Sequence, residues 1–119
     1  MNMKNELVEA IVEGLRNVKA NDITWLDLTD IEQRALDDMV LCSANTAVQI
    51  RALAEEVEAE VKKQCHVSPI AVHGLDNAQW VAIDYGHAMV HVMTPEARTF
   101  YDIDSLWGDA KTTHYTDEF

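Results

Sequence analysis

The segment DMVLCS, residues 38–43, limits the choice of fold more than any other stretch of this chain. Its apolar side chains follow one another without polar residues in between, which is typical of a strand that is buried on both faces. Such strands occur in sheets that are covered by helices on both sides. The segment therefore predicts an α/β fold, in which helices pack on a sheet.

A long helix is predicted directly after this strand. The tetrapeptide SANT offers the side-chain oxygens of Ser43, Asn45 and Thr46 as N-caps. Apolar residues then recur at helical spacing to about Gln64, namely Ile50, Leu53, Val57 and Val61. Because SPIAVHGL, residues 68–75, predicts another strand, we expect strand, helix and strand to form a right-handed crossover unit.

The remaining elements complete one mixed sheet. Alternating or β-branched runs predict strands over residues 23–28, 80–85 and 89–93, and turns near residues 76–79 and 86–87 connect them as hairpins. Helices are predicted over about residues 3–20 and from Thr94-Pro95 onward, where apolar residues recur at Phe100, Ile103, Leu106 and Trp107. We therefore expect a single domain over residues 1–108 with about five strands, and an acidic, loosely held tail over residues 109–119.

The net charge of −12 says most about partners. An acidic surface repels phosphate backbones and favours a basic protein or a cation, although acidity that serves only solubility stays an alternative. We therefore expect no direct binding of nucleic acid. No apolar run is long enough for a signal peptide or a membrane span, so we expect a cytoplasmic protein without membrane contact. Cys42 and Cys65 are expected to be free thiols, with Cys42 a small buried hydrophobe.

Nucleotidyl transfer is the first chemistry to weigh. A helix N-terminus after a strand, as at SANT, is a place where phosphates bind. Two-metal catalysis also needs two carboxylates that point the same way, most simply at alternate positions of one strand. The strand around Asp84 offers one carboxylate, and Asp102 and Asp104 lie in a predicted helical segment where they point apart. A nucleotide-binding or nucleotidyl-transferring enzyme therefore stays the alternative interpretation.

The histidines do not form a metal-binding motif. His87 and His91 are four residues apart, a spacing that aligns side chains on a helix but not on the predicted turn and strand. His73 could meet His91 across strands, and Cys65 and His66 are adjacent, but a third ligand is missing. No Walker or dinucleotide-binding sequence is present either. We therefore expect no metal and no cofactor.

The two hairpin strands predict a sheet with two different faces. Alternation places Val81, Ile83 and Tyr85 on one face, and Trp80 and Asp84 on the other. In the next strand Val90 and Val92 oppose a set that includes His91 and Met93. If the valine face packs on helices, the other face is a mixed surface of the kind found at protein interfaces. Composition alone leaves open whether Trp80 and the methionines are simply core.

Four segments carry a resemblance to a known family. They are LDL at residues 26–28, DDMVLCSANTAVQIRALAEEV at 37–57, WVAIDYGHAMVHVM at 80–93 and R-x-F-Y-x-x-x-x-L-W at 98–107. The patterns G-x-x-x-x-x-W-V, from Gly74, and D-Y-G-x-x-x-V-H-V-M, from Asp84, are specific. In order and spacing the chain resembles the ribosomal silencing factor family, also called Iojap, over nearly its whole length.

The resemblance implies a nucleotidyltransferase-like fold without transferase activity. It also implies a cytoplasmic translational repressor that binds the large ribosomal subunit through its fourteenth protein, on the face that meets the small subunit. Bound there, the repressor would block joining of the two subunits sterically and silence translation when nutrients are limiting. A basic ribosomal protein also suits an acidic chain, because long-range attraction accelerates their encounter.

By position in the matched motifs, a set of residues is expected to bind this partner: Trp80, Asp84 and Tyr85 first, with His91, Met93, Arg98 and Tyr101 beside them. Trp80 is expected to be the anchor, since tryptophans are frequent hot spots of interfaces. No catalytic residue is expected. The exposed edge of the hairpin could also pair two copies, so a homodimer is a further expectation.

Overall fold

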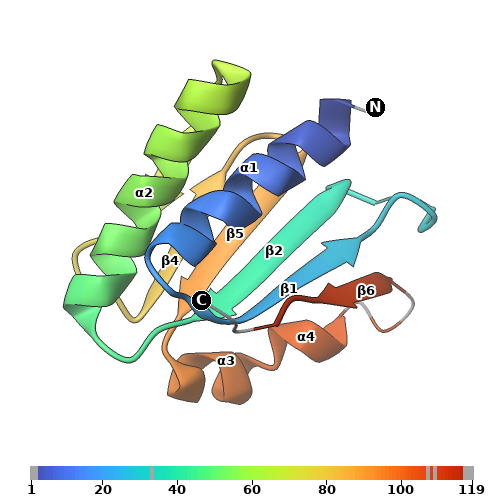
Figure 1. The fold of residues 1–119 in the computed structure, drawn as a ribbon. Helices are drawn as coiled ribbons and strands as arrows, with labels where there is room; N and C mark the ends of the chain where they lie inside the picture. The colour runs from blue at the N-terminus through green and yellow to red at the C-terminus, as the bar shows by residue number, and fades with distance from the viewer. Residues whose placement is uncertain (1–2, 33, 107, 109, 117–119) are drawn as a thin grey trace.

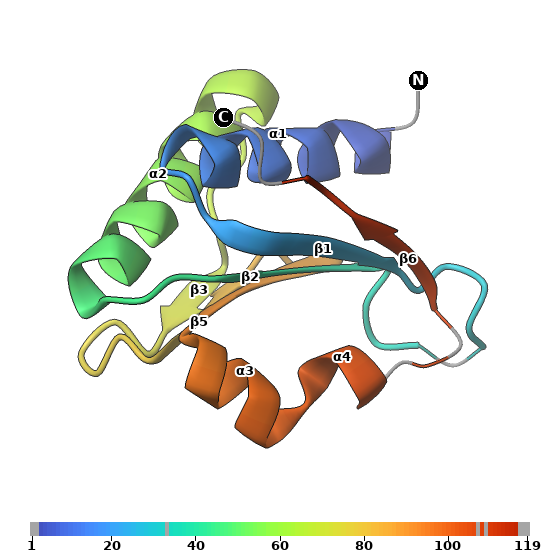
Figure 2. The ribbon, with the colours of Figure 1, turned by 60° about the horizontal axis from the view of Figure 1, so that its bottom comes forward.

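A mixed six-stranded sheet lies between two pairs of helices in the computed structural model, which describes residues 3–32, 34–106, 108 and 110–116 (Figures 1 and 2). The strands are β1 (Asn21–Asp27), β2 (Asp38–Ser43), β3 (Ala71–His73), β4 (Trp80–Asp84), β5 (Ala88–Met93) and β6 (Lys111–His114). The helices are α1 (Met3–Asn17), α2 (Ala47–Cys65), α3 (Pro95–Tyr101) and α4 (Ile103–Leu106). Figure 2 shows α1 and α2 on one face of the sheet and α3 and α4 on the other.

The strand β2 lies inside the sheet and is buried at all six of its positions, as its apolar sequence predicts. The strands follow one another in the order β3-β4-β5-β2-β1-β6. β2 pairs with β1 in the antiparallel sense and with β5 in the parallel sense. The prediction of an α/β fold with a mixed sheet is therefore confirmed, with six strands in place of about five.

The chain leaves β2 through α2 and reaches β3 at one edge of the sheet. Thr46 caps α2, since its hydroxyl accepts a hydrogen bond from the amide of Gln49 at 3.1 Å. The helix ends at Cys65, and His66 after it takes a left-handed conformation with φ of 59°. Two antiparallel hairpins, β3-β4 and β4-β5, then bring the chain back beside β2. The strands on either side of α2 are thus separated by two others.

The segment that we expected to be a loosely held tail supplies the other edge strand. β6 pairs in the antiparallel sense with β1, and Thr113 lies opposite Trp25. The next residue, Tyr115, donates its amide to the carbonyl of Ile23 at 2.9 Å. Its ring centroid lies 5.2 Å from the guanidinium carbon of Arg16 on α1. All four residues of β6 are exposed, so no apolar alternation predicts this strand from the sequence.

Two apolar clusters fill the space on the two sides of the sheet. The larger one lies under α1 and α2 and contains Cys42, whose burial raises the pKa of its thiol to about 12. This confirms Cys42 as a small buried hydrophobe. The smaller cluster contains Leu41, Met93 and Ile103, on the side of α3 and α4. The positions of β4 on this second face are only partly buried.

The C-terminal helix begins as predicted but is interrupted. The hydroxyl of Thr94 caps α3 by accepting a hydrogen bond from the amide of Ala97 at 3.1 Å, and Pro95 follows in the first turn. Asp102 then takes a left-handed conformation with φ of 49°, which separates α3 from α4. Trp107, placed in this helix by its spacing, lies outside the described residues. No described helix is long and apolar enough to cross a membrane.

Candidate docking surface

The strand β4 has two faces, as its alternation predicts. Val81 and Ile83 are fully buried in the cluster under α1 and α2. Trp80, Ala82 and Asp84 point to the other face and are only partly buried. The valines of β5 also pack under the helices α1 and α2, which confirms the predicted orientation of the hairpin.

Trp80 lies at the border between the smaller cluster and the solvent. Its indole Nε1 donates a hydrogen bond to Nδ1 of His91 at 2.9 Å. Its ring also contacts the ring of Tyr101 on α3, with the centroids 4.7 Å apart. Trp80 is only partly buried. Its indole N–H is bonded to His91 inside the protein, while part of the ring is accessible to solvent. A core role and a binding role are therefore compatible for this residue.

Two further aromatic rings extend this surface along α3. Tyr101 is 53% exposed and Phe100 is 80% exposed. Their rings meet edge to face, with the centroids 5.0 Å apart. A groove of about 470 Å³ runs beside them and is also lined by Gln79, Thr94 and Ala97. We refer to Trp80, Phe100 and Tyr101 as the aromatic surface. Because the three rings contact one another, they form a contiguous apolar patch, which is a common feature of interaction sites.

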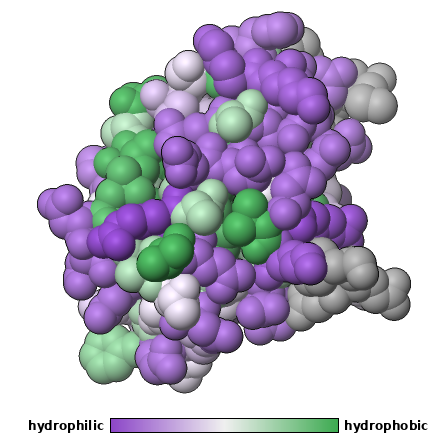
Figure 3. All heavy atoms as spheres, turned by 60° about the vertical axis from the view of Figure 1, so that its left-hand side comes forward, coloured by the Kyte–Doolittle hydropathy of each residue, from purple (hydrophilic) through white to green (hydrophobic). Residues whose placement is uncertain are grey.

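Phe100 is a candidate that the motif analysis missed. Its helical spacing from Ile103 suggests a packed side chain, but the break at Asp102 removes that register. The signal in the sequence is the adjacent aromatic pair Phe100-Tyr101 in a short helix, because only one stripe of such a helix faces the sheet. Figure 3, turned toward α2 and the β3 edge, also shows apolar residues scattered between polar ones on that side. Among the residues whose side chains the structure describes, the other large exposed apolar ones are Val48, Val67, Ile70 and Leu75.

Several of the expected site residues lie elsewhere. His91 is 6% exposed and Met93 is fully buried. Neither is available to a partner: His91 accepts the indole N–H of Trp80, and Met93 lies opposite Trp80 on β5 in the cluster against which Trp80 packs. Tyr85 belongs to the cluster under α1 and α2, on the opposite side of the sheet, and burial raises the pKa of its hydroxyl. Asp84 accepts a hydrogen bond from the amide of Gly86 at 2.8 Å and so orders the turn into β5.

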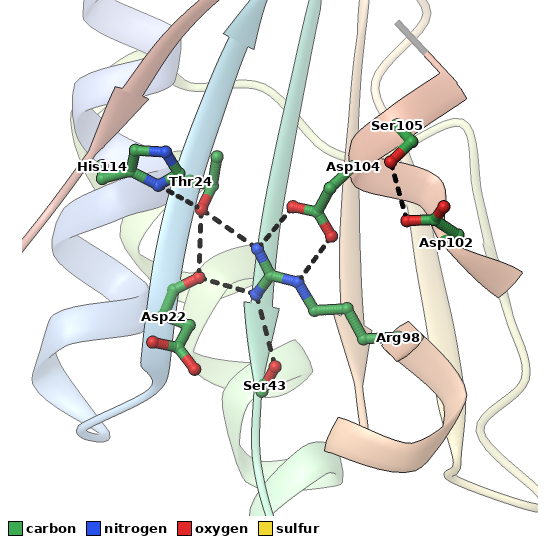
Figure 4. Close-up of polar contacts among 8 residues, drawn as sticks. All are labelled: Asp22, Thr24, Ser43, Arg98, Asp102, Asp104, Ser105 and His114. Atoms are coloured by element: carbon green, nitrogen blue, oxygen red, sulfur yellow. Dashed lines mark hydrogen bonds and ion pairs between the residues drawn. The ribbon is translucent and has the colours of Figure 1, made fainter. Parts of the chain in front are cut away.

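Arg98 faces away from the aromatic surface, into a cleft of about 610 Å³ between β1, the end of β2 and the helices α3 and α4. Figure 4 shows the guanidinium at the centre of a set of polar contacts. It donates to both carboxylate oxygens of Asp104, at 3.0 and 2.8 Å. It also donates to the carbonyl of Asp22 at 2.7 Å, to the hydroxyl of Thr24 at 3.0 Å and to that of Ser43 at 3.3 Å.

This cleft is poorly suited to a nucleotide. All five N–H donors of the Arg98 guanidinium are directed at acceptors of the protein itself, so none is left for a phosphate. The Arg98 guanidinium also lowers the pKa of Asp104, which keeps that carboxylate charged. Asp102, the neighbouring carboxylate, accepts a hydrogen bond from the hydroxyl of Ser105 and does not share a ligand position with Asp104.

The histidine pair proposed from the sequence does not form. His73 lies opposite Ala82 on β4, and Ala82 lies opposite His91 on β5. The strand β4 therefore separates the two rings, and the expectation that they could meet across strands is wrong. Within the described ranges, no group of three or more His, Cys, Asp or Glu side chains is arranged to hold a metal ion.

The comparisons with known proteins agree with the motifs. The model of a family described as ribosomal silencing factor during starvation matches residues 2–118. The chain belongs to this family. A Chromobacterium violaceum protein named ribosomal silencing factor RsfS is 35% identical over 109 residues, which are 89% of this chain and 85% of that protein. A solved structure of a Chromobacterium violaceum protein superimposes with a TM-score of 0.82 at 31% identity, covering 91% of this chain and 88% of that one.

A more distant relative has a name that refers to the large ribosomal subunit. A Mus musculus protein named mitochondrial assembly of ribosomal large subunit protein 1 is 28% identical over 102 residues. These residues cover 84% of this chain but only 44% of the mouse protein. The shared part is therefore the domain described here, and the mouse protein has additional sequence.

The structure explains the glycine in the RsfS-like pattern G-x-x-x-x-x-W-V. Gly74 has φ of 91°, and a Cβ atom on it would lie 2.1 Å from the carbonyl oxygen of Trp80. The loop between them is held to α2 by Arg51, which donates to the carbonyls of Leu75 at 2.9 Å and Asp76 at 2.8 Å. Only glycine permits this close approach, so Gly74 fixes the backbone that carries Trp80.

We predict that Gly74→Ala destabilises the protein by about 1–3 kcal/mol, because the new methyl group meets backbone atoms that cannot move independently and φ is positive. Urea unfolding followed by circular dichroism measures this change. Gly108→Ala is the matched control, since a Cβ there would lie 3.9 Å from the carbonyl oxygen of Ser105, which is an ordinary van der Waals contact. Equal stability of the two variants would show that the loop adjusts without cost.

Proposed function

We propose that this protein binds the large ribosomal subunit through its fourteenth protein, on the face that meets the small subunit, and thereby blocks subunit joining sterically. Translation is silenced in this way when nutrients are limiting. The observation that carries the proposal is the aromatic surface, in which three neighbouring rings remain partly or largely exposed on a folded domain. Membership of the ribosomal silencing factor family supports the ribosome as the target.

Charge and apolar contacts have separate roles in this proposal. The net charge of −12 attracts a basic ribosomal protein over long range and raises the rate of encounter. The rings of the aromatic surface then exclude water at the contact, which slows dissociation. Within the expected set of binding residues, Trp80 and Tyr101 make the contact, while His91 and Met93 hold Trp80 in place. Asp84 contributes through the turn that it orders.

Sedimentation with purified ribosomal particles tests the proposal directly. The protein is expected to co-sediment with isolated large subunits, and to do so poorly with small subunits or with assembled ribosomes. It is also expected to reduce the yield of assembled ribosomes when it is added before the two subunits are mixed. Equal binding to large subunits and to assembled ribosomes would contradict the steric mechanism, and no binding to any particle would contradict the target.

We further propose that the protein acts in the cytoplasm without catalysis. Two-metal nucleotidyl transfer needs paired carboxylates, whereas Asp84 is engaged in a turn and Asp104 in an ion pair with Arg98. Incubation with labelled nucleoside triphosphates and magnesium is expected to yield no product. Turnover that is lost in Asp84→Asn would establish the enzyme instead.

A homodimer also remains part of our proposal, with β3 as the contact. β3 lies at the edge of the sheet, so its outer backbone groups have no strand beside them within the described chain. Ile70, directly before β3, is 72% exposed. Light scattering is expected to give the mass of a dimer for the unmodified protein and that of a monomer for Ile70→Lys. A monomer in both cases would remove the homodimer from the proposal.

A further inference from the structure

The helix α3 carries two of the three rings of the aromatic surface, although it has little apolar attachment to the fold. None of its residues is buried. Ala97 is its contribution to the smaller cluster, and the ring contact between Tyr101 and Trp80 is the other apolar link. A seven-residue helix is too short to be stable by itself, so its position must come from tertiary contacts.

Arg98 supplies the strongest of those contacts. Its side chain is 12% exposed and reaches from α3 across to three other elements. The acceptors lie on β1, at Asp22 and Thr24, at the end of β2, at Ser43, and on α4, at Asp104. The rigid fork of a guanidinium makes such simultaneous contacts, whereas the point charge of a lysine does not.

We propose that Arg98 is a positioning residue for the aromatic surface: it locks α3 and α4 to the ends of β1 and β2, so that Phe100 and Tyr101 stand beside Trp80. This inference rests on the proposed function, in which those rings meet the partner. It replaces the expectation that Arg98 itself contacts the partner, because its side chain is nearly covered and all of its donors are in use. Its effect on binding is therefore indirect.

The first test needs no partner and uses the indole N–H signals of tryptophan in ¹H–¹⁵N spectra. The chain has three tryptophans, and Trp80→Phe and Trp25→Phe identify the signals of these two residues among the three. In Arg98→Gln, the Trp80 signal is expected to shift or broaden as Tyr101 moves away. The Trp25 signal is expected to stay, because its indole donates to Asp38 at the start of β2 at 2.9 Å and packs against the cluster under α1 and α2, on the face of the sheet opposite α3. An unchanged Trp80 signal, or an equal change in the Trp80 and Trp25 signals, would contradict the local positioning role of Arg98.

The second test measures whether Arg98 acts through the rings. Affinity for isolated large subunits is measured for four proteins. They are the unmodified protein, Arg98→Gln, the double variant Phe100→Ala/Tyr101→Ala, and the triple variant that combines all three changes. Arg98→Gln is expected to weaken binding about tenfold in the full chain and less than about twofold when both rings are absent. A loss of the same size in both backgrounds would mean that Arg98 contacts the partner itself, and the inference would be wrong.

Two further variants keep the test informative if Arg98→Gln does not fold. Asp104→Asn removes the ion pair but keeps one acceptor, so it is expected to move the Trp80 signal in the same direction and by less. Arg98→Lys keeps the charge but loses the forked donors of the guanidinium. Its Trp80 signal and its affinity are expected to be closer to those of Arg98→Gln than to those of the unmodified protein. If the unmodified protein does not bind large subunits, the proposed function fails, while the spectra still decide whether Arg98 positions α3.

Discussion

Trp80→Ala is expected to weaken binding to the large ribosomal subunit by about 30-fold to 1,000-fold, which corresponds to about 2–4 kcal/mol. The change removes the largest ring of the aromatic surface, against which the ring of Tyr101 packs with its centroid 4.7 Å away. It also leaves Nδ1 of His91 without the indole donor. The loss therefore combines the missing apolar contact with the disorder of its neighbours, and we expect it mainly in the dissociation rate.

Surface plasmon resonance with immobilised large subunits measures the effect, after urea unfolding has shown that the variant is folded. Trp80→Phe keeps an apolar ring but loses the hydrogen bond to His91, so its affinity is expected to lie between those of the unmodified protein and Trp80→Ala. Thr113→Ala on β6 is the matched surface control, because β6 is at the opposite edge of the sheet from β3 and β4. An affinity of Trp80→Ala within about twofold of the control would remove Trp80 as the anchor.

The local elements could be predicted because their signals depend on neighbouring residues only. The apolar run of β2, the cap at Thr46 and the alternation from Trp80 to Asp84 each encode burial or a hydrogen bond within a few positions. The order of the strands is different, since β2 meets β5 only after the chain has passed through α2 and two hairpins. Pairing of that kind is decided by tertiary packing.

The candidate site shows the same division. Trp80 and Tyr101 were found from motifs, and the structure places their rings together. Tyr85 follows the buried positions Val81 and Ile83 in the alternation, so the sequence itself indicated its burial more reliably than the motif indicated a contact. The role of Arg98 depends on residues that are 55 to 76 positions away along the chain for three of its acceptors. No local pattern contains that information.

The stability of the protein is expected to fall as the pH is lowered from about 6.5 to about 4, because of His91. Burial lowers the pKa of His91 from 6.5 to about 4 in the folded protein. Between these values the unfolded chain takes up a proton on this ring while the folded protein does not, so acid favours unfolding. The stabilisation is fully present above pH 6.5 and is on the order of 3 kcal/mol smaller near pH 4.

The hydrogen bond from Trp80 gives this prediction a structural basis. Nδ1 of His91 accepts from the indole N–H, so it must be unprotonated, and a second proton on the ring would leave two donors facing each other. Protonation therefore opposes the same contact that holds Trp80 at the aromatic surface. Ion pairing of Asp104 with Arg98 lowers the pKa of a carboxyl group that normally titrates near 3.8, so its contribution is lost at lower pH than that of His91.

Urea unfolding at a series of pH values measures this dependence, and His91→Gln isolates it. Glutamine can still accept the indole N–H but does not titrate, so the slope of stability between pH 6.5 and 4 is expected to flatten in this variant. His73→Gln changes an exposed histidine of β3 and is expected to keep the slope of the unmodified protein. Equal slopes in His91→Gln and the unmodified protein would show that the buried ring is protonated without unfolding, and that Trp80 does not depend on a neutral His91.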